Sequence, residues 1–114
     1  MTGRISSRFL VQALIRRVEV EGGFAAILHV GDPDSGSIMV QLIDRRAPQI
    51  QLLERIPDFS GGYRLEPVAP QYSDDPMEMA QYVDRRIKAD RDMWLVELDV
   101  ANAQQLADEI LIIG

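Results

Sequence analysis

Cysteine is absent from this chain, and lysine, histidine and tryptophan are nearly so. Its 114 residues include one lysine, one histidine and one tryptophan. The absence of cysteine excludes disulfides, thiolate catalysis and cysteine-bound zinc or iron–sulfur centres. No apolar run approaches the ~20 residues of a membrane-spanning helix, so we expect no membrane partner. Arg16 and Arg17 interrupt the apolar stretch near the N-terminus, which argues against a secretory signal and predicts a cytoplasmic protein.

Positive charge is scarce in the second half of the chain. The formal net charge is −6. Residues 1–57 carry seven arginines against six acidic residues, whereas residues 58–114 carry five basic residues against twelve acidic ones. An acidic half repels phosphate, and the near-neutral half offers no basic stripe in compensation. We therefore expect no nucleic-acid partner.

Hydrophobic periodicity predicts one α+β domain spanning residues 1–114. The expected order is helix, three strands, a short fourth strand, helix, strand and helix. Such a chain is expected to form an antiparallel sheet of four to five strands with the helices packed mainly on one face. The expected elements are a helix from about Ser7 to Glu21, a hairpin over residues 23–44 that turns at "GDPDSG", strands at 50–56 and 63–69, a helix at 76–90, a strand at 93–100 and a helix after Asn102.

Three short patterns predict details of these elements. Asp75, Pro76 and Glu78 have the spacing of a helix start, in which the aspartate caps the first backbone N–H groups. Asn102 is predicted to cap the last helix in the same way. Pro67 has no N–H to give to a sheet, so its strand is expected at an edge.

Residues with catalytic or metal-binding chemistry are few. The stretch "DPDSG", residues 32–36, resembles the opening of a calcium loop but lacks the later oxygen ligands, so a turn is the preferred interpretation. His29 is the single histidine, and no nucleophile-elbow sequence accompanies it. Glycine-rich phosphate loops are missing. We therefore predict no catalytic residue, no metal and no cofactor.

Paired arginines recur three times along the chain. Forked guanidinium groups suit carboxylates and phosphates, although arginines at helix ends and in turns are also ordinary surface charge. If the pairs gather in space, they would form an anion site or a surface for an acidic partner. The candidate ligand or partner surface comprises Arg16, Arg17, His29, Arg45, Arg46, Arg85 and Arg86.

The stretch "DRDMWLVELD", residues 90–99, resembles the D-P-D-L-W-x-V-E-I-E signature of DUF1491, a family of short proteins without an assigned activity, mostly from alphaproteobacteria. "LIRR" followed by "GGFAAILHVGDPDSGSIMV" is similar to the first helix and first hairpin of that family. The similarity covers roughly residues 6–99. It implies the same fold and a cytoplasmic bacterial setting, and it implies no site residue.

Two functions remain open from the sequence. The first is a small non-enzymatic binding or assembly module that self-associates as a homodimer, because apolar residues such as those of the terminal "ILIIG" exceed what a small monomer hides. The second is a protein that binds a small molecule or anion, or a weak hydrolase, using clustered arginines with His29. A second protein or a small anionic ligand is the expected partner.

Trp94 is predicted to be a core residue. In a strand, the side chains of Trp94, Val96, Leu98 and Val100 point to the same face, and that face is wholly apolar. A buried indole needs a partner for its N–H group, so we expect it to donate to a backbone carbonyl.

Replacing Trp94 with alanine is expected to lower the free energy of unfolding by about 3–5 kcal/mol, because the substitution leaves a large cavity in the core. Urea unfolding followed by circular dichroism measures this loss. A Trp94→Ala protein as stable as the parent would instead mark the tryptophan as a ligand contact.

Overall fold

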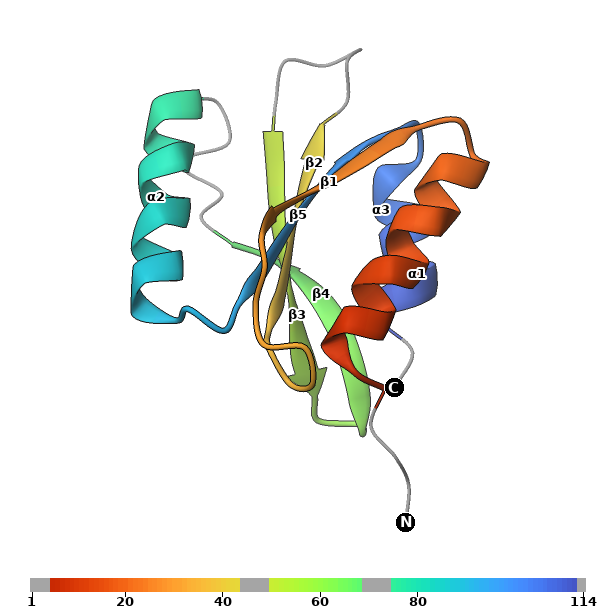
Figure 1. Ribbon diagram of the computed structural model, residues 1–114, viewed down its shortest axis with the longest axis horizontal. Coiled ribbons are helices and arrows are strands. Elements are labelled where there is room, and N and C mark those ends of the chain that lie inside the picture. Colours follow the sequence, from red (N-terminus) through yellow and green to blue (C-terminus); the bar gives the residue numbers. More distant parts are fainter. Residues whose placement is uncertain (1–4, 44–49, 69–74, 113–114) are drawn as a thin grey trace.

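The computed structural model describes residues 5–43, 50–68 and 75–112. It confirms the α+β fold and the predicted order of elements (Figure 1). The elements are α1 (Ser7–Val20), β1 (Phe24–His29), β2 (Ile38–Ile43), β3 (Ile50–Asp58), β4 (Gly62–Pro67), α2 (Pro76–Ala89), β5 (Trp94–Asp99) and α3 (Ala103–Leu111).

The five strands form one open sheet in the order β1-β5-β2-β3-β4. Three of its pairings are antiparallel, and the pairing of β2 with β5 is parallel. The predicted hairpin of β1 and β2 is therefore wrong, because β5 lies between these two strands. The chain does reverse direction at residues 30–37, but it passes over the start of β5 to do so.

Strand β5 lies inside the sheet, between β1 and β2, and buries apolar side chains on both of its faces. Trp94, Val96 and Leu98 belong to one buried cluster, whereas Leu95 belongs to a second cluster on the other face. Trp94 is 4% exposed, and its indole N–H donates to the carbonyl oxygen of Asp32 at 2.8 Å. The predicted core position of Trp94 and its backbone partner are both confirmed.

Helices cover the two faces of the sheet unequally. Helices α1 and α3 pack together on one face, while α2 lies on the other (Figure 1). Two of the three helices thus share a face, in line with the expected packing. The larger cluster joins α1 and α3 to β2, β3 and β5. The smaller cluster beneath α2 comprises Met39, Leu52, Met79, Val83, Met93 and Leu95.

The predicted helix start at Asp75 is confirmed, whereas the predicted cap at Asn102 is wrong. The Asp75 carboxylate accepts the backbone N–H groups of Met77 and Glu78. Asn102 has a φ of 60° and makes no capping hydrogen bond through its side chain. Asparagine tolerates this left-handed conformation, so its role is to turn the chain between β5 and α3. Pro67 ends β4, which is an edge strand as predicted.

Residues 31–37 are held tightly where they cross the start of β5. The backbone N–H of Asp32 donates to the carbonyl of Asp92 at 2.9 Å, and that of Trp94 donates to the carbonyl of Ser37 at 2.7 Å. The buried Ser7 hydroxyl, at the start of α1, donates to the carbonyl of Gly36 at 2.6 Å. A β-carbon on Gly36 would lie only 2.1 Å from the Asp92 carbonyl oxygen.

Gly36→Ala is therefore expected to destabilise the protein by roughly 1–3 kcal/mol, because the crossing loop has to move away from β5. Gly62→Ala is the matched control, since its β-carbon would meet no atom within 4 Å. Urea unfolding of the two variants makes the comparison. Equal stability of Gly36→Ala and Gly62→Ala would contradict the close crossing described above.

Candidate functional site

Several exposed apolar side chains lie close together along β1, at one edge of the sheet. Strand β1 pairs with β5 on one side, and no described strand lies on its other side. Phe24 is 70% exposed and Leu28 is 49% exposed. Val30, directly after the strand, is 67% exposed. The outer backbone groups of β1 thus stand beside large apolar side chains in contact with solvent.

The register with β5 explains why these side chains are exposed. Ile27 lies opposite Val96 and points toward the α1 side of the sheet. Phe24 lies opposite Asp99 and points to the other face, beyond the smaller cluster that α2 covers. The register shifts between Ile27 and His29, so Leu28 forms a β-bulge. Phe24 and Leu28 are therefore left exposed at the outer edge of β1.

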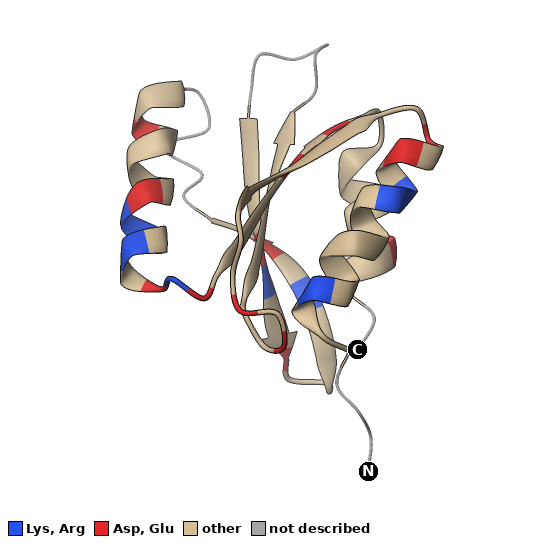
Figure 2. Ribbon diagram, viewed as in Figure 1, with Lys and Arg blue, Asp and Glu red and all other residues tan. Residues whose placement is uncertain are grey.

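The opposite edge of the sheet is built in a different way. Strand β4 carries Arg64, Glu66 and Pro67, and Arg64 pairs with Glu66 at 2.8 Å and with Asp58 at 3.4 Å. Charged residues and proline on an edge strand prevent other chains from adding to the sheet. By contrast, residues 22–31 contain no Lys, Arg, Asp or Glu, and the ribbon of β1 bears no charge colour (Figure 2). Among the described residues, the β-bulge at Leu28 is the feature of β1 that limits such pairing.

His29 holds β1 against the beginning of β5. Its Nδ1 lies 2.7 Å from the carbonyl oxygen of Met93.

The crossing loop that follows β1, residues 30–37, contains the "DPDSG" turn. There the Asp32 carboxylate accepts the backbone N–H of Ser35 at 2.9 Å and that of Asp34 at 3.1 Å. These hydrogen bonds lower the pKa of the Asp32 carboxyl, and the bond from the Ser35 backbone has the largest effect. Across the described ranges, no three His, Asp or Glu side chains are placed to hold a metal ion.

The arginine pair on α1 is divided between an ion-pair network and solvent. Arg17 contacts the carboxylates of Glu21 at 2.7 Å and Glu109 at 3.1 Å, so it ties α1 to α3. The hydrogen bond with Glu21 is the main cause of the raised pKa of Arg17. Arg16 is exposed on the same helix.

The pair on α2 is divided in the same way. Arg86 contacts the Glu54 carboxylate and the Tyr82 hydroxyl, each at 2.8 Å, while Arg85 is exposed. Because α1 and α2 cover opposite faces of the sheet, the structure does not bring these two pairs together (Figure 2). Arg45 and Arg46 lie outside the described residues.

Two residues of the C-terminal "ILIIG" segment, Ile110 and Leu111, pack into the monomer's own core. Leu111 is fully buried, and its carbonyl accepts the Arg55 side chain at 2.6 Å. Ile112 is partly exposed, and residues 113–114 lie outside the described range. The exposed apolar strand is thus β1, for which the sequence pattern predicted pairing with β2. The uncharged run at residues 22–31 was the available signal for an open edge.

Comparison with known proteins identifies relatives of the whole domain. The family described as "Protein of unknown function (DUF1491)" matches residues 5–108. A crystal structure of a DUF1491 family protein from Caulobacter crescentus is similar with a TM-score of 0.80 and 27% identity, covering 90% of this chain and 94% of that one. A solution structure of a protein from A. tumefaciens is similar with a TM-score of 0.75 and 29% identity, covering 90% and 92%. No curated protein matches. None of the described helices is long and apolar enough to cross a membrane.

Proposed function

The chain belongs to the DUF1491 family, and we propose that it is a small, non-enzymatic, cytoplasmic assembly module that forms a homodimer through β1. In the proposed dimer, the outer edge of β1 pairs with the same edge of a second copy, so that two sheets become one. The observation that carries the proposal is the contrast between the two sheet edges, since β4 is protected by charge and proline while β1 is uncharged and apolar.

Backbone hydrogen bonding supports this mode of association. The side of β1 that faces away from β5 presents N–H and C=O groups to which an added strand can bond. The β-bulge at Leu28 interrupts this ladder, so regular pairing is expected over the segment from Phe24 to Ile27. The exposed side chains of Phe24 and Leu28 would then lose contact with water on both faces of the joined sheet.

Charge favours a second copy of this chain as the partner at this place. A protein with a net charge of −6 repels itself, so its copies associate most readily where no like charges meet. Residues 22–31 provide such a surface, because they carry no formal charge. Two identical strands in antiparallel pairing obey a two-fold axis, which is the commonest symmetry of soluble oligomers.

The double variant Phe24→Lys/Leu28→Lys is expected to abolish the dimer. It places two like charges on each copy of the paired edge, while both side chains are exposed in the monomer. Sedimentation velocity over micromolar concentrations measures the effect. The parent protein is expected to approach twice the 12.8 kDa chain mass, and the variant is expected to dimerise at least about tenfold more weakly.

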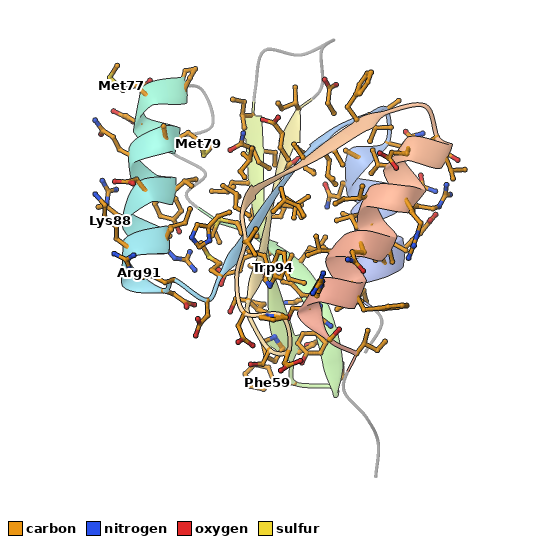
Figure 3. The ribbon with its side chains drawn as sticks, viewed as in Figure 1. Phe59, Met77, Met79, Lys88, Arg91 and Trp94 are labelled. Atoms are coloured by element: carbon orange, nitrogen blue, oxygen red, sulfur yellow. The ribbon has the colours of Figure 1, made fainter. Side chains whose placement is uncertain are left out.

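Phe59→Lys/Met77→Lys is the matched control. It makes the same change in net charge at two exposed apolar side chains, at the β3–β4 turn and at the start of α2, both far from β1 (Figure 3). This variant is expected to dimerise like the parent. A parent protein that stays monomeric throughout, or equal weakening by both double variants, would contradict dimerisation through β1.

A further inference from the structure

A cleft of about 350 Å³ opens between the first turns of α1 and the end of β1. This volume lies at the small end of the range of about 300–1,000 Å³ that is typical of small-molecule sites. Trp94 forms part of its wall, on the α1 side of the sheet (Figure 3). The lining residues are Arg8, Val11, Gln12, Ile27, Val30, Gly31, Pro33 and Trp94.

Most of the cleft wall is apolar and firmly held. Val11 is fully buried, and Trp94 is fixed by the bond from its indole N–H to the Asp32 carbonyl at 2.8 Å. The indole N–H is thereby used within the fold, so Trp94 offers apolar ring surface to the cleft. The crossing loop that carries Pro33 is itself held to α1, because the backbone N–H of Arg8 donates to the Pro33 carbonyl at 3.0 Å.

Two polar side chains stand at the cleft without partners in the described parts of the chain. Arg8 and Gln12 lie one turn apart on α1, and neither makes a side-chain hydrogen bond or an ion pair to a described residue. In contrast, Arg17, Arg64 and Arg86 each contact acidic side chains. An unpaired arginine in a chain of net charge −6 is thus available to an anion, and guanidinium binds carboxylates especially well.

We propose that this cleft binds a small apolar monocarboxylate. The hydrocarbon part packs against Val11, Trp94 and Val30, while the carboxylate accepts hydrogen bonds from Arg8 and the Gln12 amide. A singly charged ligand fits better than a phosphate dianion, because one arginine supplies one positive charge in an acidic protein. Phe24 and Leu28, the two side chains changed in the dimerisation test, do not line the cleft, whereas Ile27 and Val30 belong both to its wall and to the edge proposed for dimerisation.

Titration with octanoate tests the proposal through the fluorescence of Trp94, the chain's only tryptophan. A saturable change is expected with octanoate, and binding of octan-1-ol is expected to be at least about tenfold weaker, because the alcohol lacks the charge that Arg8 recognises. Amide chemical shifts of Val11, Gln12 and Val30 are expected to move over the same range of octanoate concentration.

Arg8→Gln is expected to weaken octanoate binding at least about tenfold. Arg16→Gln is the matched control, because Arg16 is exposed on the same helix but does not line the cleft. If both variants weakened octanoate binding equally, the loss would reflect general charge attraction, and the proposed site would be overturned. Equal affinity of the parent protein for octanoate and octan-1-ol would overturn the carboxylate specificity. The absence of any saturable change with octanoate would overturn the site altogether.

Discussion

The insertion of β5 between β1 and β2 is the constraint on which the rest of the structure depends. It gives a strand with buried apolar side chains on both faces two strand neighbours and a helix layer on each face. It also forces the chain from β1 to β2 across the start of β5, where Trp94 and the Asp32 carbonyl hold the crossing loop. Strand β1 is thereby displaced to the edge of the sheet, and its apolar side chains are left facing solvent.

Local patterns in the sequence were sufficient to predict the helices and strands, but not to predict which strands pair with each other. The helices, the face of Trp94 and the edge position of Pro67 follow from periodicity and from backbone chemistry, which are local properties. Strand pairing is a non-local property. Crossing β5 takes roughly 10 Å, twice the strand spacing, and the eight residues 30–37 reach up to roughly 26 Å, so hairpin and crossing loop were both compatible with the sequence.

The candidate site illustrates the same limit. Arginine pairs were visible in the sequence, but only the fold shows that those of α1 and α2 lie on opposite faces of the sheet. Conversely, Arg8 and Gln12 belong to no conspicuous sequence motif. Their position beside an apolar cleft depends on how α1 packs against the end of β1. The open edge had a signal in the uncharged run at residues 22–31. That signal could be read only once β2 was known not to cover β1.

Backbone amide hydrogen exchange of the unmodified protein, measured at low and high protein concentration, tests most directly that β1 is an edge left open for a second copy. Exchange reports on each strand separately. The proposed dimer requires that amides of β1 gain protection at high concentration while those of β4, the charged edge, stay unchanged. Exchange at β1 that does not vary with concentration, or protection gained at β4 instead, would contradict it.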